Sequence, residues 1–359
     1  MRFGLYYEMQ TPPGADHHRA YWDAVSEVEA ADRLGFDLLT VVEHHGHEQF
    51  SISANPLAFF SAVAQRAPRL RFRTAVHTLP LHNPMRLAAE IAVADILTNG
   101  RIECGVGRGH PWVLIAAGVP LEESRARFEE VLAILEMAWR EPRVSFAGRF
   151  HTIRDQVVVP RPVQKPHPKL FSPIRDARAA RRGWGTLTAP VYPGAETRDE
   201  IVAHVAACRT HGQTPDVVYI RAVYLDEDPD RARRDAAPFI RNFFAYNAAP
   251  RATLPPKDEL ERAGYGNYTT GKLEAIARLS LDEMLEQEIV FVGTPERVAE
   301  QIDRVGRILG VTEFAMIANY GGIEHARVLR TLQLFADRVM PALRAASGDG
   351  ARSASRSSA

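Results

Sequence analysis

Cysteine is almost absent from this chain. Its two cysteines, Cys104 and Cys208, are far apart in sequence and lie in apolar or helical surroundings. Such spacing favours two buried thiols in a reducing compartment over a disulfide. The sequence therefore predicts a cytoplasmic protein whose stability comes from its core rather than from cross-links.

An excess of charge and long apolar runs are also lacking. Lysine plus arginine and aspartate plus glutamate both number 44, so the formal net charge is zero. This balance gives no general affinity for nucleic acid or for an anionic membrane. No apolar stretch reaches the length of a membrane span, and the first residues lack the charged region and apolar core of a signal peptide. We expect neither nucleic acid nor membrane as a partner.

What is present is a regular alternation of short β-rich runs and longer helical patterns, which is typical of a parallel sheet built from βα units. The expected strands are Phe3–Tyr7, Asp37–Val42, Arg71–Val76, Arg101–Val106, Lys169–Pro173, Asp216–Leu225 and Glu313–Asn319. The helical patterns cover 21–34, a segment from Asn55-Pro56, 84–97, 122–139, 229–248, a segment from Thr294-Pro295, and 324–344. About eight such units predict an α/β fold of the (β/α)₈ TIM-barrel type.

Two insertions interrupt the alternation. A hairpin around Ala147-Gly148 is expected after the fourth βα unit, and a proline-rich stretch follows it. A long polar insertion, 249–288, precedes the last strand and is our candidate lid over a site. We expect one barrel domain over residues 1–345 and a disordered tail over 346–359.

The run EHHGHEQF, Glu43–Phe50, directly follows the second expected strand. Loops at the C-terminal ends of barrel strands carry the chemistry of this fold, and an acid with three imidazoles can move protons or bind a metal. His45 and His47 form an HxH pair like that of metal-dependent barrel hydrolases. The later strand ends, however, offer no carboxylate after Asn319 and arginines instead of histidines after Pro173. We therefore expect no metal, and proton chemistry at His44 rather than at His45 or His47.

Two more strand ends carry candidate ligand-binding residues. Ala75 and Val76 leave room for a planar ligand, and His77 and His82 follow them. After the fourth strand, the glycines of Gly105–Gly109 let the backbone approach an anion that Arg108 would attract, although a structural turn fits the same pattern. Further along lies a cluster of arginines that is either a solvated helix face or a phosphate site: Arg175, Arg178, Arg181 and Arg182.

Taken together, the chain resembles the bacterial luciferase-like, flavin-dependent monooxygenase family over nearly its whole length, to about Leu343. The segments that carry the resemblance stand in the family's order: EHH, LPLHNPMRLAAE, GRIECGVGRG, PRPVQKPHP, VGTPERVAEQI and LFADRVMPAL. The resemblance implies a barrel that binds reduced FMN at its C-terminal mouth. It also implies a separate flavin reductase that supplies the FMNH2, and a homodimer.

Carried over residue by residue, Glu43 and His44 match the acidic and catalytic positions after the second strand. Ala75 and Val76 match the pair that meets the isoalloxazine, often through a non-proline cis peptide. Arg108, between Gly107 and Gly109, matches a phosphate-contacting arginine. Gly107 stands where luciferase itself has a reactive cysteine, which disfavours light emission by that route.

The main departure from the family lies after the strand Lys169–Pro173. There the family has a longer Ser- and Thr-rich segment that clamps the FMN phosphate. Either Ser172 and the arginines, Arg175 among them, take over the phosphate, or flavin binding is weakened.

The leading functional hypothesis is a two-component monooxygenase that uses FMNH2, O2 and C4a-peroxyflavin chemistry on a small organic substrate, with His44 as general base or acid. Candidates for the substrate pocket are Tyr6, His77, Trp112 and Tyr320, for each of which barrel packing is the alternative. The competing hypotheses are a deazaflavin-dependent hydride-transfer enzyme, a non-catalytic flavin-binding or partner subunit and, last, a metal hydrolase.

Overall fold

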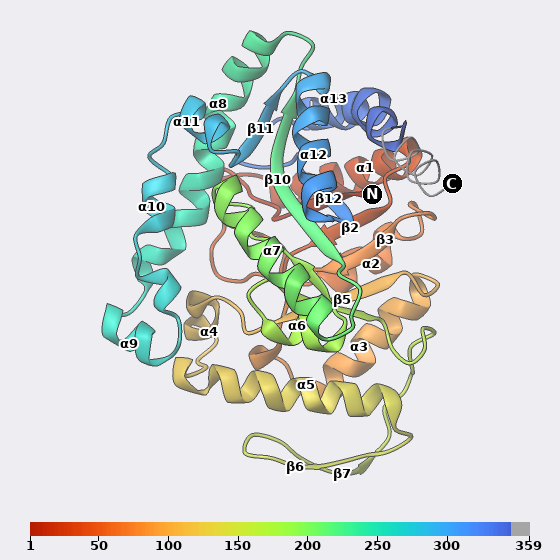
Figure 1. Ribbon diagram of the computed structural model, residues 1–359. Helices are drawn as coiled ribbons and strands as arrows, with labels where there is room; N and C mark the ends of the chain where they lie inside the picture. The colour runs from red at the N-terminus through yellow and green to blue at the C-terminus, as the bar shows by residue number, and fades with distance from the viewer. Residues whose placement is uncertain (346–359) are drawn as a thin grey trace.

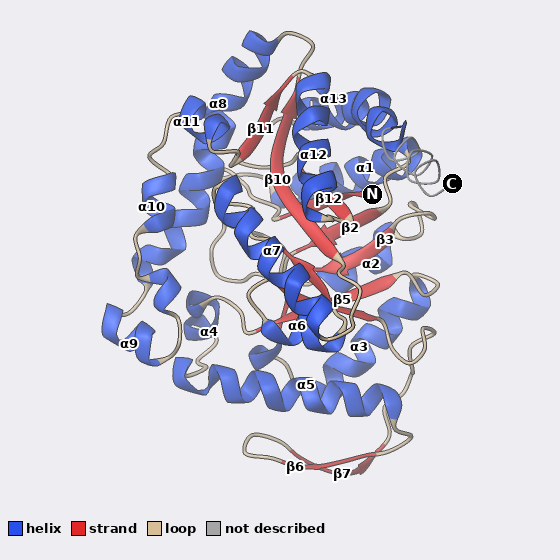
Figure 2. Cartoon of the chain, viewed as in Figure 1, coloured by secondary structure: helices blue, strands red, loops and turns tan. Residues whose placement is uncertain are grey.

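The structure is a computed structural model that describes residues 1–345, so the tail expected at 346–359 lies outside the described residues. Its centre is a closed ring of parallel strands (Figures 1 and 2), which confirms the predicted barrel. In ring order the strands are β1 (Arg2–Tyr7), β2 (Leu38–Val41), β3 (Arg71–Thr74), β5 (Ile102–Gly107), β8 (Lys169–Pro173), β9 (Gly185–Leu187), β10 (Val217–Leu225) and β12 (Glu313–Ile317). The ring closes where β12 pairs with β1.

Helices surround the ring on the outside (Figure 1). They are α1 (His17–Leu34), α2 (Pro56–Val63), α3 (Pro84–Leu97), α4 (Pro111–Ala116), α5 (Ser124–Arg140), α6 (Ala177–Arg182), α7 (Gly194–Thr210), α8 (Pro229–Ala248), α12 (Pro295–Leu309) and α13 (His325–Leu334). Within residues 1–345, no helix has both the length and the apolar character needed to cross a bilayer.

Elements outside the ring extend it at specific edges. The strand β4 (His77–Thr78) pairs with β5, and β11 (Val290–Gly293) pairs with the last residues of β10. The expected hairpin is present as β6 (Val144–Ala147) and β7 (Thr152–Gln156), and Figure 2 shows it beyond α5, away from the barrel. The insertion 249–288 folds into α9 (Lys257–Arg262), α10 (Lys272–Ile276), α11 (Leu281–Glu286) and the 3₁₀ turns η3 (Ala249–Thr253) and η4 (Gly266–Tyr268).

Local capping signals explain why several helices begin and end where they do. Asn55, Asn83 and Thr294 each accept a hydrogen bond from a backbone N–H of the first turn, and a proline follows each of them. The helix α1 ends at Gly35, whose φ of 82° lies in the left-handed region that glycine adopts readily. It begins earlier than the sequence predicts, because Asp16 caps it ahead of the apolar pattern.

Three strands, β4, β9 and β11, were not predicted from the sequence. They are only 2, 3 and 4 residues long, too short for an alternating or β-branched pattern to stand out. β9 also begins with Gly185, a residue that disfavours strand assignment. The packing explains this glycine, since a Cβ at Gly185 would lie 2.0 Å from the ring of Phe171 on the neighbouring strand.

The barrel interior holds a buried ionic cluster, defined by Arg73 on β3, Glu103 on β5 and Glu313 on β12. The Arg73 side chain is fully buried and donates to Glu103 Oε2 from Nε at 2.8 Å and to Glu313 Oε1 from Nη1 at 2.8 Å. Its guanidinium also lies over the Phe171 ring, 3.9 Å from the centroid. Burial opposes ionisation of Glu103, but Arg73 and its arginine neighbours hold the pKa of that carboxyl below its usual value.

We predict that Arg73→Met lowers the free energy of unfolding by up to about 3–5 kcal/mol, because it removes the fully buried cation and leaves the two carboxylates only the partly exposed Arg2 and Arg71 as partners. Chemical denaturation followed by circular dichroism measures the change. The triple variant Arg73→Met, Glu103→Gln, Glu313→Gln should recover much of the loss, since no buried charge is then left unpaired. The exposed control Arg86→Met removes only a surface pair with Glu90. A loss no larger in Arg73→Met than in this control would contradict the prediction.

Candidate functional site

A cavity of about 800 Å³ opens at the C-terminal ends of the barrel strands and extends under the insertion 249–288. Its volume lies in the range typical of small-molecule and cofactor sites. Most of the residues singled out from the sequence line it: Tyr6, His44, Ala75, Val76, Gly107, Arg108, Gly109, Trp112 and Arg175. Residues from strand ends far apart in the sequence therefore meet in one cavity.

Four of the candidates lie behind the cavity wall rather than in it. Glu43 and Ser172 are buried next to wall residues. Against expectation, His77 and Tyr320 do not line this cavity. The His77 ring is turned to Glu43, and Tyr320 is fully buried with its ring edge against Phe243 of α8, 5.8 Å between centroids. The chain turns away after β12, so Tyr320 packs against a helix instead of facing the barrel mouth.

The imidazole of His44 is the titratable group of the early cluster that faces the cavity. It is 8% exposed, and its Nδ1 has no hydrogen-bond partner among the described residues. Phe50 and His110 lie against the ring, with centroids at 4.6 and 5.0 Å. Burial lowers the pKa of His44 to about 3, although the Glu43 carboxylate acts in the opposite direction. His44 is therefore neutral at physiological pH.

Glu43 lies behind His44 and is held by other histidines. Its two carboxylate oxygens are each 2.8 Å from a ring nitrogen, Nδ1 of His77 and Nε2 of His82. Burial alone would raise the pKa of Glu43, but hydrogen bonds from His45, His77 and His82 hold it well below its usual value. The ligand atoms of Glu43, His77 and His82 lie within 4.8 Å of one another. Direct hydrogen bonds already account for this arrangement without a metal ion.

Two ring residues near His44 were missed in the sequence: His110, which contacts His44, and Tyr268, which contacts His110. His110 stacks on Trp112 with centroids 4.3 Å apart, and its Nδ1 lies 2.5 Å from the hydroxyl oxygen of Tyr268. Burial, reinforced by the neighbouring His44 and Arg251, lowers the pKa of His110 well below its usual value. The position of His110, directly after Gly109 at a strand end, could have indicated it. Tyr268 belongs to the insertion, where no periodic pattern marks it.

Arginines gather at the α6 side of the cavity, but they differ in how far their charge is neutralised. Arg175 pairs with Glu196 and Glu200. Arg178 pairs with Asp176 and Glu129. By contrast, Arg125 and Arg181, which also line the cavity, make no hydrogen bond or ion pair with any residue in the described range.

Arg108 is bound to the insertion. It donates to the backbone carbonyl oxygens of Ala263, at 3.2 Å, and Gly264, at 2.5 Å, and its guanidinium lies 3.7 Å from the centroid of the Tyr265 ring. These partners are neutral, so the charge of Arg108 has no acidic counterpart. The same side chain therefore fastens the insertion and offers a positive charge to the cavity.

The peptide bond between Ala75 and Val76 is cis, as the resemblance predicted. Both residues line the cavity beside Gly107. A Cβ at Gly107 would lie 2.4 Å from a Val76 methyl carbon, so glycine is the residue that fits there.

Glu8, at the end of β1, is a buried carboxyl group in the cavity wall that was not predicted from the sequence. It accepts hydrogen bonds from the side-chain amides of Gln10 and Asn247, both at 3.1 Å. Burial nevertheless raises its pKa to about 7, because these neutral amides do not offset the lost hydration. Its place directly after a strand, as for Glu43, is the signal that could have identified it.

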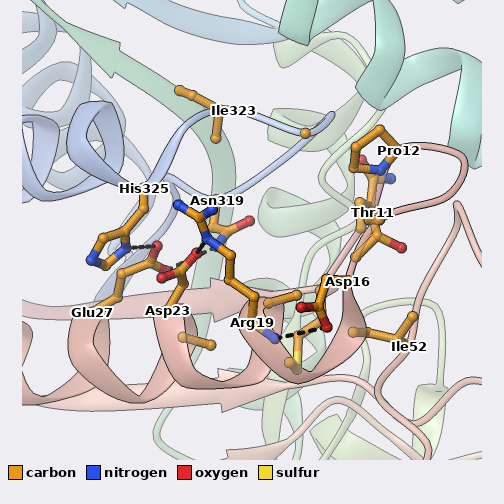
Figure 3. A pocket seen from close by; sticks show the side chains of 16 residues that line it. Thr11, Pro12, Asp16, Arg19, Asp23, Glu27, Ile52, Asn319, Ile323 and His325 are labelled. Atoms are coloured by element: carbon orange, nitrogen blue, oxygen red, sulfur yellow. Dashed lines mark hydrogen bonds and ion pairs between the residues drawn. The ribbon is translucent and has the colours of Figure 1, made fainter.

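A second, smaller hollow of about 170 Å³ lies between α1 and the loop after β12 (Figure 3). There Glu27 accepts hydrogen bonds from Asn319, at 2.9 Å, and from the Tyr7 hydroxyl, at 2.5 Å, and lies 2.9 Å from Nδ1 of His325. These contacts join α1, β1 and α13. We assign this hollow a structural role, since its polar groups bind one another.

The raised pKa of Glu8 predicts a specific dependence of stability on pH. An unfolded chain ionises Glu8 near pH 4.5, whereas the folded protein holds the proton until about pH 7. The folded wild type therefore loses stability as the pH rises through this window, by up to about 3 kcal/mol. Glu8→Gln should be at least as stable as wild type at pH 8 and lose this advantage at pH 4.5.

Denaturation at both pH values measures the effect, with the exposed Glu286→Gln as the matched control. A Glu8→Gln curve that runs parallel to the wild-type curve between pH 4.5 and 8 would show that the pKa of Glu8 is not raised.

The sequence and the fold were compared with those of known proteins. The sequence model of the luciferase-like monooxygenase family matches residues 1–313. The oxygenase component of the flavin-dependent trigonelline monooxygenase of Acinetobacter baylyi is 23% identical, over 95% of each chain. An F420-dependent glucose-6-phosphate dehydrogenase of Intrasporangium calvum is 25% identical, over 90% of this chain and 95% of its own.

Among solved structures, the monooxygenase RslO1 from Streptomyces bottropensis superposes with a TM-score of 0.78 at 26% identity, over 95% of this chain and 99% of its own. Both the sequence relatives and this structure span nearly the whole barrel. The chain therefore belongs to the luciferase-like monooxygenase family.

Proposed function

We propose that this protein is an FMNH2-dependent monooxygenase that acts on a small organic substrate with O2. The observation that carries the proposal is the cavity itself, in which unneutralised arginines lie on one side and the buried, neutral His44 faces the same space. The similarity to a flavin-dependent oxygenase component over 95% of the chain supports it. By the same similarity, a separate reductase would supply FMNH2.

The cavity residues fit a flavin with a phosphate tail. Arg108, Arg125 and Arg181 lack acidic partners and would hold the phosphate, whereas Arg175 is already paired with two glutamates. The flat surface at Ala75, Val76 and Gly107 would receive the ring system. Ser172 is fully buried outside the cavity wall, and its hydroxyl has no partner among the described residues, so it would not contact a phosphate in the cavity without a local rearrangement.

When bound, reduced flavin supplies the electrons that activate O2, and the chain supplies position, a dry site and control of protons. His44 is neutral, so its ring offers one N–H donor and one acceptor nitrogen instead of a charge. Nδ1 is buried and Nε2 makes no hydrogen bond among the described residues, so a ligand in the cavity would meet the ring through Nε2. The rings of Phe50 and His110 lie against the imidazole and shield it from water.

We further propose that the insertion 249–288 acts as a lid. It places Tyr265 and Tyr268 over the cavity and is tied to the barrel through the hydrogen bonds of Arg108 to Ala263 and Gly264. Arg108 therefore belongs both to the proposed phosphate site and to the lid. Arg108→Ala should weaken FMN binding and increase proteolytic cleavage within the insertion.

The second candidate function is hydride transfer with F420, favoured by the relative from Intrasporangium calvum. A direct comparison of the cofactors distinguishes the two candidate functions. The purified protein is titrated with FMN, FMNH2 and F420, and O2 consumption is then followed with each reduced form. Tight binding of F420 without O2-dependent product would reject the monooxygenase.

We predict that His44→Gln lowers product formation by about 10²–10⁴-fold, because it removes a proton donor and acceptor at the reacting atoms. FMN affinity should stay within about threefold of wild type. Product is measured by mass spectrometry in the presence of a reductase, with a panel of small organic substrates that begins with trigonelline.

The matched control is His47→Gln, in the same loop but outside the cavity wall. Equal product from His44→Gln and from this control would exclude a catalytic role for His44. Product from neither the wild type nor any variant would favour a non-catalytic subunit.

A homodimer is also part of this proposal. Val93, Ile96 and Leu97 are exposed apolar residues near the end of α3 and offer a face for a second copy. Sedimentation of wild type and Ile96→Lys distinguishes a dimer through this face from a monomer.

A further inference from the structure

Arg251, in the η3 turn of the insertion, lines the cavity with a charge that no residue in the described range 1–345 neutralises. Its Nε and Nη1 are buried and have no hydrogen-bond partner among residues 1–345. A buried guanidinium without an acceptor is costly, and in native proteins such donors normally meet a ligand, an ion or water. The Arg251 guanidinium therefore lacks a hydrogen-bond acceptor that a ligand could supply.

The acidic residues in the cavity wall do not supply that acceptor. Glu129 and Asp176 are paired with Arg178, and Glu200 is paired with Arg175. Glu8 accepts from Gln10 and Asn247. Among the described wall residues, every acid is thus engaged elsewhere, and Arg251 keeps its full charge for a ligand.

A second orphaned donor lies beside the same tyrosine. The indole Nε1 of Trp112 is buried without a partner, and the Trp112 ring meets the Tyr268 ring edge to face at 5.6 Å. The Arg251 guanidinium lies over that same Tyr268 ring, 4.9 Å from its centroid. Both groups are donors only, with no acceptor capacity. A ligand that satisfies both must carry acceptor atoms, and a carboxylate is the acceptor that matches the charge and geometry of a guanidinium.

The position of Arg251 indicates that the group it binds belongs to the substrate and is not the phosphate of the cofactor. Arg251 lies over Tyr268, whose hydroxyl oxygen is 2.5 Å from His110 Nδ1, and the His110 ring centroid is 5.0 Å from that of His44. The group bound at Arg251 is therefore next to the proposed reaction centre. The arginines suited to a phosphate lie on α5 and at the ends of β5 and α6.

We propose that Arg251, with Trp112, recognises a carboxylate on the substrate, so that the enzyme acts on small organic acids. The apolar body of such an acid would rest among Phe50, Trp112 and Tyr268. This inference rests on the proposed function for its meaning, because it names the substrate class of that site.

The test compares isosteric ligands that differ only in charge: benzoate with benzamide, and cyclohexanecarboxylate with cyclohexanecarboxamide. Affinities are measured by titration calorimetry on the full chain as wild type, Arg251→Met, Arg251→Lys and the control Arg262→Met. Arg262 is an exposed arginine of the same insertion, paired with Asp258. Thermal unfolding of each variant verifies that the fold is kept.

Wild type and Arg262→Met should bind each carboxylate at least about tenfold more tightly than its amide, because a hydrogen bond to a charged group adds that much affinity. Arg251→Met should reduce the ratio to about one, and Arg251→Lys should restore part of it. Equal binding of acid and amide by wild type, or a preference that survives Arg251→Met, overturns the inference. So does the absence of any carboxylate binding.

A parallel titration of every variant with FMN separates this inference from the proposed function. A carboxylate preference that depends on Arg251 in a protein that binds no FMN rejects the monooxygenase and retains the acid site. Loss of FMN binding in Arg251→Met, without a carboxylate preference in wild type, assigns Arg251 to the cofactor instead.

Discussion

The contact on which the barrel depends is the bridge that Arg73 makes between Glu103 and Glu313. Its two partners come from β5 and β12, on opposite sides of β3 in the ring, so one side chain spans the interior that the strands enclose. Burying a charged cluster in a barrel interior destabilises the fold unless every hydrogen-bond donor and acceptor of the cluster is paired. Here the Arg73 guanidinium donates to three carboxylate oxygens and lies over an aromatic ring, which fixes how the strands face one another.

Because the strands are held in place, the loops at their C-terminal ends form a ring. This ring brings together residues that are far apart in the sequence. His44 after β2, the Ala75–Val76 pair after β3 and Arg108 after β5 reach one cavity for this reason. The insertion closes the side that the strand ends leave open. It adds Tyr265, Tyr268 and Arg251 to the cavity wall.

Many of the helices and strands could be predicted from the sequence, because they are determined by residues close together in the chain. Caps such as Asn83 and Thr294, and apolar runs such as Val217–Leu225, act on their immediate neighbours. Glu8, His110 and Arg251 escaped notice because their importance arises from residues brought to them by folding. Tyr320 was misplaced for the same reason, since the path of the loop after β12 decides which way that ring points. The short β9 carries too few residues to show any pattern.

The hydrogen bonds of Arg108 to the Ala263 and Gly264 carbonyl oxygens have a thermodynamic consequence. A group shared by two processes links their equilibria, and the linkage is equal in both directions. Whatever free energy an anion gains from an Arg108 already ordered by the insertion, the insertion gains in return as added order. If the cofactor binds as proposed, its binding and the closing of the barrel mouth by the insertion would be one coupled equilibrium.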